Sequence, residues 1–181
     1  LSLAEGDLLV DVRLTEGHEN ILIATHQGRA ITFDETEVRA MGRQAAGVRG
    51  IRLAEGDYVV GAARARKGAQ VLSVTENGYG KRTPVEDFSI HHRGGGGILL
   101  HGLTDKTGLV AGIAVVDPEN DIMMITDDGV IIRTPVEDIR QCGRNSQGVI
   151  VMRTGEDVKV ISIARTDKEE EDEEAETPAE S

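Results

Sequence analysis

Short apolar runs alternate with polar turn segments along most of the chain. The runs are rich in Val, Ile and Leu and lie at residues 8–14, 20–25, 110–116, 122–126 and 130–133. The turn dipeptides Asn77-Gly78 and Asp128-Gly129 favour the tight connection that joins two antiparallel strands. No window shows a sustained helical periodicity. The pattern therefore predicts an all-β chain that is built from hairpins.

This pattern repeats three times with a period of about 50 residues. The hairpin around Gly28 recurs around Gly78 and Gly129, at intervals of 50 and 51 residues. A short acidic turn follows each hairpin, and then a loop that contains Gly and Arg. The three loops read Gly42-Arg43-Gln-Ala-Ala-Gly47, His92-Arg93-Gly-Gly-Gly-Gly97 and Gly143-Arg144-Asn-Ser-Gln-Gly148. A fixed period of this size, with four strands in each unit, is typical of one propeller blade.

The repeat divides the chain into units of about residues 7–56, 57–108 and 109–156, followed by a closing strand at residues 157–165. Residues 47–53 are expected to form the strand that follows the first loop. Leu3-Ala-Glu-Gly-Asp7 recurs as Leu53-Ala-Glu-Gly-Asp57, so residues 1–7 are expected to be the tail of an earlier blade. The chain also begins with Leu rather than Met, and we expect it to be a piece of a longer polypeptide. The fold predicted is a propeller-like repeat with about three full blades and parts of two flanking ones.

Composition narrows the class of protein. The chain has two Phe, two Tyr and no Trp, which argues against the WD-repeat and kelch propellers with their aromatic motifs. The single Cys142 excludes an internal disulfide. Neither a signal peptide nor an apolar run of membrane-spanning length is present, so a cytoplasmic location is expected.

The negative charge is concentrated at the C-terminus. The formal net charge is −12, but nine of the 32 acidic residues lie within residues 167–180. Without these nine acids and Lys168, 23 acids and 19 bases remain, a net charge of −4. Residues 166–181 are therefore predicted to be a disordered acidic tail. Such a tail can serve solubility or can compete with a polyanion for a basic groove, and the sequence leaves both open.

Basic residues recur at equivalent positions of the repeat. They occupy one loop position, the hairpin strands and the positions before the loops, and they are Arg29, Arg39, Arg43, Lys81, Arg82, Arg93, Arg133, Arg140 and Arg144. Equivalent positions in a ring of blades lie on the same rim, so these side chains are predicted to form one basic arc that binds a polyanion. The alternative is a solvated surface balanced by the acids of the intervening turns.

The loop at residues 91–97 contains four successive glycines after Arg93. Such a backbone can approach a bulky ligand closely and present N–H groups to it, as phosphate-binding loops do. Gly94, Gly95 and Gly97 are further candidates for binding, although a flexible connector is the better explanation of the loop taken on its own. His91 and His92 lack partners at metal-ligand spacing, and no catalytic arrangement of residues is found.

The repeated motif resembles the C-terminal domain of bacterial DNA gyrase A. The resemblance covers residues 1–165 and is carried by Met41-Gly-Arg-Gln-Ala-Ala-Gly-Val-Arg-Gly-Ile-Arg-Leu53, Gly80-Lys-Arg-Thr83, Gly129-Val-Ile-Ile-Arg-Thr134 and Gly143-Arg-Asn-Ser-Gln-Gly-Val149. It implies a β-pinwheel, a propeller-like ring whose blades exchange strands. The box that characterises the family, Gln-Arg-Arg-Gly-Gly-Lys-Gly, normally lies in the first blade. The loop at residues 91–97 resembles a degenerate copy of it.

The resemblance also implies a function. Duplex DNA is expected to wrap around the basic rim through phosphate contacts, without base readout, and to support ATP-dependent negative supercoiling by a bacterial enzyme, a type II DNA topoisomerase. The expected partners are duplex DNA, the rest of gyrase A and the ATPase partner of gyrase A. ATP, Mg²⁺ and the catalytic tyrosine would lie outside this chain, which is expected to hold no cofactor or metal. The alternatives are the equivalent C-terminal domain of topoisomerase IV and a propeller scaffold that binds proteins.

Overall fold

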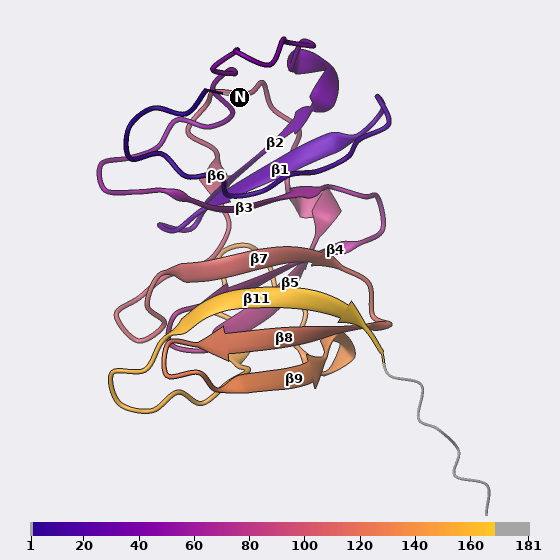
Figure 1. Cartoon of the computed structure of the whole chain (residues 1–181). Helices are drawn as coiled ribbons and strands as arrows, with labels where there is room; N and C mark the ends of the chain where they lie inside the picture. The colour runs from indigo at the N-terminus through magenta and orange to yellow at the C-terminus, as the bar shows by residue number, and fades with distance from the viewer. Residues whose placement is uncertain (1, 169–181) are drawn as a thin grey trace, which may run out of the picture.

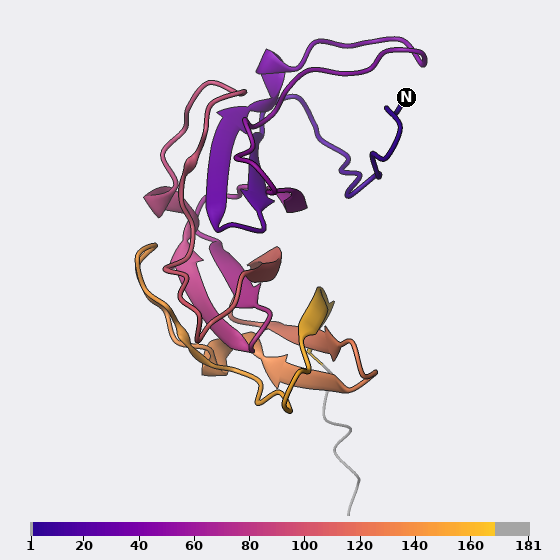
Figure 2. The ribbon, with the colours of Figure 1, turned by 90° about the vertical axis from the view of Figure 1, so that its left-hand side faces the viewer.

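The computed structural model describes residues 2–168 and contains three antiparallel sheets that follow one another along an arc (Figures 1 and 2). The first sheet has the order β3 (Val59–Arg64), β1 (Asn20–Thr25), β2 (Arg29–Asp34) and β6 (Ile98–Leu99). The second has the order β7 (Val110–Val116), β4 (Gln70–Thr75), β5 (Tyr79–Pro84) and β10 (Val149–Ile150). The third consists of β11 (Val160–Asp167), β8 (Asn120–Thr126) and β9 (Ile131–Pro135). The predicted all-β, propeller-like fold is confirmed.

Each sheet is built on one of the predicted hairpins. The turns of β1–β2, β4–β5 and β8–β9 contain Gly28, Gly78 and Gly129, with φ angles of 80°, 78° and 88°. A side chain at such a φ is strained, which explains the glycine at the same place in every copy. A 3₁₀ turn follows each hairpin, and the three are η1 (Glu35–Glu37), η2 (Val85–Asp87) and η3 (Val136–Asp138).

Neighbouring repeats exchange strands. β6 follows the second Gly/Arg loop but pairs with β2 of the first hairpin, with Ala30 opposite Ile98. In the same way β10 pairs with β5, with Gly80 opposite Val149. No strand occupies the corresponding place beside β9 within residues 2–168. The second and third Gly/Arg loops therefore each connect a hairpin of one sheet to a strand of the preceding sheet.

A glycine at the end of each loop permits this crossing. A Cβ atom added to Gly97 would lie 2.5 Å from the Ala30 carbonyl oxygen, and one added to Gly148 would lie 2.4 Å from that of Gly80. Gly47, at the equivalent place in the first loop, has no atom within 4 Å of such a Cβ. The glycine is thus required where the chain crosses onto a preceding sheet.

The strands on the inner side of the arc also meet. A Cβ added to Gly61 of β3 would lie 3.2 Å from Ile113 of β7, and one added to Gly112 of β7 would lie 3.0 Å from Ile163 of β11. Gly61 and Gly112 occupy the same position of the repeat. The absence of a side chain therefore lets successive inner strands approach closely.

The prediction of strands at residues 8–14 and 47–53 is wrong. Residues 8–14 correspond to β3 one repeat earlier, yet Leu8 and Leu14 are 83% and 88% exposed. The segment does lie beside β3, because the Asp11 carboxylate accepts a hydrogen bond from the Ala62 N–H group at 3.4 Å. Within residues 2–168 there is no further sheet with which either segment can pair, so neither acquires a ladder of hydrogen bonds.

The predicted boundary of the acidic tail also needs correction. Strand β11 continues to Asp167, and Thr166 and Asp167 pair with Asp121 and Asn120 of β8. The closing strand therefore spans Val160–Asp167 rather than residues 157–165, since the ladder with β8 holds two residues that were assigned to the tail. Residues 169–181, the remainder of the predicted tail, lie outside the described residues.

The core is aliphatic and follows the sheets. Leu22, Val71 and Val110 belong to the cluster between the first and second sheets, and Leu72, Met124 and Ile139 to the cluster between the second and third. The helices within residues 2–168 all lack the length and apolar character that crossing a bilayer requires.

Candidate nucleic-acid interface

The second and third Gly/Arg loops lie on the convex side of the arc (Figure 2). The loop after η2 runs back along the outer edge of the first sheet and ends in β6. The loop after η3 runs back along the second sheet and ends in β10. The second and third loops thus share one side of the arc, whereas the first Gly/Arg loop extends away from that side (Figure 2).

The repeated arginine of the second and third loops fastens each of these loops to the preceding repeat. Nη1 of Arg93 donates a hydrogen bond to the Arg49 carbonyl oxygen, and Nη1 of Arg144 donates to that of Leu99, both at 3.1 Å. Arg49 and Leu99 occupy equivalent positions of the repeat. The regular spacing of these arginines thus reflects a repeated structural contact.

Glu37 holds Arg93 from the other side. The Arg93 N–H group donates to the Glu37 carboxylate at 3.1 Å, and Nε of Arg93 donates to the Glu37 carbonyl oxygen at 3.0 Å. Arg93 is consequently half-buried and fixed in orientation. Its guanidinium group connects the first acidic turn with the first and second loops.

The glycines of the second loop contact the first loop rather than an open binding surface. The Gly94 N–H group donates to the Gly50 carbonyl oxygen, and the Gly95 carbonyl oxygen accepts from the Arg52 N–H group at 2.8 Å. Gly97 lies where the chain crosses onto β2. The arrangement favours the alternative of a connector over that of a phosphate-binding loop.

Lys81 was expected on the basic arc, but its side chain is fully buried. Its Nζ atom donates to the carbonyl oxygens of Gly143 and Arg144 at 2.8 and 2.6 Å. Burial lowers the pKa of Lys81 to about 8. Because the ammonium group lies inside the third loop, it cannot reach a duplex, and we remove Lys81 from the candidate interface.

Arg82 and Arg133 are half-buried, and their guanidinium groups contact other parts of the fold. All three guanidinium nitrogens of Arg82 donate hydrogen bonds, to the carbonyl oxygens of Ile139 and Glu137 and to the side chain of Gln70. Arg133 forms an ion pair with Asp121 at 2.8 Å and donates to the Asp167 carbonyl oxygen at 2.7 Å. Arg82 thus holds the turn around η3, and Arg133 joins β8 to the end of β11.

Seven arginines have exposed side chains along the loops and the outer edges of the sheets. Arg29, Arg39, Arg43 and Arg140 were predicted, whereas Arg49, Arg52 and Arg153 were not. Arg29 lies opposite Leu99 of β6, and a guanidinium nitrogen of Arg52 lies 3.6 Å from the position of a Cβ at Gly96. Together they form the exposed rim, a name that we use for these seven residues.

Arg49 and Arg52 were not predicted because they do not recur as basic residues from one repeat to the next. Leu99 and Gly102 occupy the equivalent places in the second copy. Both side chains are exposed because the segment that carries them forms no ladder of hydrogen bonds, which the sequence did not indicate.

Three acids of the intervening turns, Glu35, Glu37 and Glu86, accept hydrogen bonds from backbone N–H groups. The Glu86 carboxylate accepts a hydrogen bond from the Gly68 N–H group at 2.6 Å, and this bond holds the pKa of Glu86 below its usual value. The exposed rim can therefore present guanidinium groups to a polyanion, and phosphate contacts of this kind carry no sequence information. In the described part of the chain, no three His, Cys, Asp or Glu side chains are placed to hold a metal ion.

The sequence matches a known family once for each hairpin. The family model described as "DNA gyrase C-terminal domain, beta-propeller" matches residues 19–66, 69–117 and 120–167. DNA gyrase A of Staphylococcus aureus (strain NCTC 8325 / PS 47) is 49% identical over 175 residues, which are 96% of this chain and 20% of that protein. The protein of the same name from strain MRSA252 is 49% identical over 178 residues, which are 97% of this chain and 20% of that protein. The chain thus spans about a fifth of the length of these relatives.

Two solved structures share the arrangement of the sheets. The C-terminal domain of DNA topoisomerase IV superposes with a TM-score of 0.86 at 32% identity, over 92% of this chain and 52% of that one. The C-terminal domain of DNA gyrase A superposes with a TM-score of 0.77 at 26% identity, over 82% of this chain and 50% of that one.

Proposed function

The chain belongs to the family of DNA gyrase C-terminal domains, and from this membership we propose that its exposed rim binds and bends duplex DNA. The observation that carries the proposal is the division of labour among the arginines. Arg82, Arg93, Arg133 and Arg144 make hydrogen bonds or ion pairs within the fold, while the side chains of the seven arginines of the exposed rim are exposed.

The duplex follows the convex side of the arc without sequence readout. Bending DNA over a short path costs on the order of several kcal/mol, which depends on the flexibility of the sequence. Guanidinium–phosphate contacts and the release of counterions offset this cost. Contacts that are spread over consecutive repeats suit the bending of a duplex, because each repeat contacts a further stretch of the phosphate backbone.

In the whole protein the bound duplex supports ATP-dependent negative supercoiling by a type II topoisomerase of the bacterial cytoplasm. The rest of gyrase A supplies the cleavage chemistry, and its ATPase partner binds ATP and Mg²⁺. The topoisomerase IV alternative has less support, because the identity is 49% to DNA gyrase A and 32% to the topoisomerase IV domain.

Binding to a duplex of random sequence, measured across a series of salt concentrations, tests the proposal. The logarithm of the binding constant should fall linearly with the logarithm of the salt concentration, with a slope of about −0.9 for each phosphate neutralised. The double variant Arg49→Glu/Arg52→Glu should bind weakly and lose about two units of slope.

Arg13→Glu/Lys159→Glu is the matched control, because it reverses two exposed charges beside the inner strands β3 and β11. If both variants weaken binding equally, the exposed rim is not the binding surface. If the unmodified chain does not bind even at low salt, the scaffold that binds proteins becomes the better explanation. The protein without residues 169–181 should bind more tightly if those acids compete with the duplex.

A further inference from the structure

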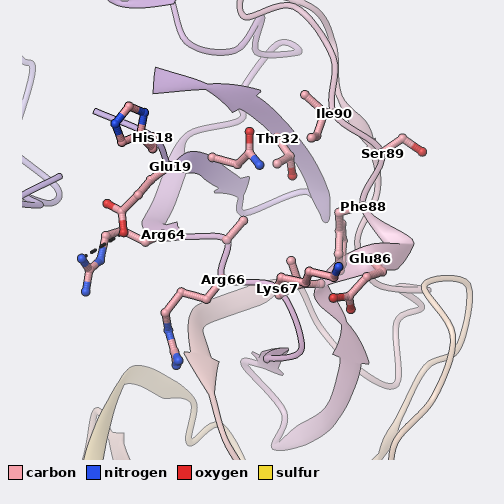
Figure 3. Close-up of a pocket in the computed structure, with 13 residues that line it drawn as sticks. His18, Glu19, Thr32, Arg64, Arg66, Lys67, Glu86, Phe88, Ser89 and Ile90 are labelled. Atoms are coloured by element: carbon pink, nitrogen blue, oxygen red, sulfur yellow. Dashed lines mark hydrogen bonds and ion pairs between the residues drawn. The ribbon is translucent and has the colours of Figure 1, made fainter. Parts of the chain in front are cut away.

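A cavity of about 630 Å³ opens between the first sheet and the turn around η2 (Figure 3). Asn20 and Thr32 line it from the first sheet, and Glu86, Phe88 and Ile90 line it from the second repeat. None of these side chains belongs to the exposed rim. The cavity is therefore separate from the proposed DNA-binding surface.

The second repeat shows what this place holds when it is filled. Thr32, one of the lining residues, is equivalent to Arg82. The guanidinium group of Arg82 donates to Gln70 Oε1 at 2.9 Å, to the Glu137 carbonyl oxygen at 3.2 Å and to the Ile139 carbonyl oxygen. One arginine side chain thus satisfies three acceptors from two repeats.

All three acceptor residues have their counterparts in the wall of the cavity. Asn20 corresponds to Gln70, Glu86 to Glu137, and Phe88 to Ile139.

The backbone frame is also the same in both copies. The His91 N–H group donates to the Thr32 carbonyl oxygen at 2.7 Å, and the Cys142 N–H group donates to that of Arg82 at 2.8 Å. Parallel bridges join Thr32 to Ile90 and Arg82 to Gln141. The first repeat therefore keeps the site for a guanidinium group but lacks the side chain that would fill it.

Thr32 leaves the site unsatisfied. Its side chain is 3% exposed, and its hydroxyl oxygen is buried with no hydrogen-bond partner in the described chain. Buried hydroxyl groups in folded proteins nearly always have a hydrogen-bond partner, because burial without one forfeits the hydrogen bonds that the group would make to water. This unpartnered group in the wall is an independent sign that the cavity accepts a polar ligand.

We propose that the cavity binds a guanidinium group from outside the chain, supplied by an arginine side chain of a partner or by a small guanidine compound. The planar fork of a guanidinium donates in several fixed directions and suits a set of separated acceptors, whereas an ammonium group is a compact point charge. This inference does not depend on DNA binding.

The arginines beside the cavity leave its acceptor side accessible. Arg64 pairs with Glu19 at 3.1 Å and Arg66 pairs with Asp117 at 2.7 Å. In Figure 3 both guanidinium groups lie on the far side of the cavity from Phe88. Neither of them therefore occupies the place of an incoming guanidinium.

Lys67 is a cation beside the Glu86 side chain (Figure 3). The hydrogen bond from Gly68 lowers the pKa of the Glu86 carboxyl group, and the charge of Lys67 lowers it further. Figure 3 shows Lys67 close to Glu86. The Lys67 ammonium group can therefore compete with an incoming guanidinium on this side of the cavity.

Titration of the full chain with ethylguanidinium, followed by backbone amide NMR shifts, tests the proposal. We expect saturable shifts at Thr32 and His91 in the millimolar range, and binding of ethylammonium that is weaker by about tenfold or more. Lys67→Ala should bind ethylguanidinium more tightly. Arg82→Ala is the positive control, because it opens the equivalent site in the second repeat.

Thr32→Arg should fill the cavity, raise the melting temperature and abolish the shifts. Thr32→Met occupies the same space without donors, and it should abolish binding even if Thr32→Arg does not fold. Saturable binding that persists in Thr32→Met, or ethylammonium that binds as well as ethylguanidinium, would overturn the proposal, as would the absence of saturable shifts in the unmodified chain.

A comparison of two ligands separates the sources of the guanidinium. If acetyl-Gly-Arg-Gly-amide binds more tightly than ethylguanidinium, the ligand is an arginine of a polypeptide. If the two bind equally, it is a small guanidine compound. Thr32→Arg should leave the salt-dependent binding of duplex unchanged, so a failure here is distinguishable from a failure of the proposed DNA binding.

Discussion

Replacement of Lys81 by Met should stabilise the chain at neutral pH and leave DNA binding intact. Lys81 is fully buried, and its equivalent in the first repeat is the buried Ile31. The ammonium group of Lys81 donates to the carbonyl oxygens of Gly143 and Arg144. Met removes the buried charge, and the carbonyl of the exposed Gly143 can bind water instead.

The magnitude follows from the pKa. Burial lowers the pKa of Lys81 from 10.5 to about 8, and each pKa unit corresponds to about 1.4 kcal/mol. This gives about 3 kcal/mol, which we reduce to about 2 kcal/mol because water reaches the surrounding loop. The folded pKa is the lower one, so the penalty is fully present below pH 8 and disappears as the pH rises to 10.5.

Urea unfolding followed by far-UV circular dichroism, between neutral pH and the pKa of free lysine, measures the effect. At pH 7 the Lys81→Met variant should be more stable by about 2 kcal/mol, and the difference should shrink as the pH rises. Both proteins should carry Cys142→Ser, because a charge on Cys142 raises the pKa of Lys81. Lys106→Met, at an exposed position, is the control.

A difference between the Lys81→Met variant and the unmodified chain that does not vary with pH would refute this reasoning. So would a loss of stability in Lys81→Met at neutral pH, because the two carbonyl contacts would then outweigh the cost of burial. If the Lys81→Met variant lost DNA affinity without losing stability, Lys81 would have to contact the duplex.

Three further predictions concern residues that fix the fold. Burial lowers the pKa of His101 to about 4. Lowering the pH from 6.5 to 4 should therefore reduce the free energy of unfolding by about 3 kcal/mol. Thermal melts should show this loss, and the His101→Ile variant should not show it. Gly97→Ala should destabilise the chain by about 3 kcal/mol, because the new Cβ clashes with backbone and φ is positive. Gly47→Ala should cost only about 1–2 kcal/mol, because φ alone is unfavourable there. Equal losses in urea unfolding would mean that Gly97 is not required where the chain crosses onto the first sheet. Arg93→Ala should cost about 1–3 kcal/mol of unfolding free energy and speed amide exchange in the first and second loops; unchanged exchange would mean that Arg93 does not fasten them.

The hairpins were predictable because their chemistry is local. Asn77-Gly78 and Asp128-Gly129 specify a turn whatever surrounds them, and the structure has a turn at each. The absence of a strand at residues 8–14 was not predictable from the apolar residues alone. A strand needs a partner, and none is available to this segment in the described chain.

The candidate site was only partly predictable because repetition shows that positions are equivalent without showing which way they face. Arg93 and Arg144 were correctly grouped, but their shared environment is the backbone of the preceding loop. Lys81 was grouped with exposed residues, although it occupies the place of a buried isoleucine. Arg49 and Arg52 are not basic in the second copy, so the repeat did not point to them. Their exposure is visible only in the structure.

The exchange of strands has a consequence for how the molecule unfolds. In most repeat proteins a terminal unit can melt while its neighbours remain folded, because only one interface is lost. Here the melting of the second hairpin withdraws β6 from the first sheet, because β6 follows that hairpin along the chain. The melting of the third withdraws β10 from the second sheet in the same way. The loss of protection from amide hydrogen exchange should therefore spread from the third sheet to the second, and from the second to the first, rather than stay confined to the sheet that melts.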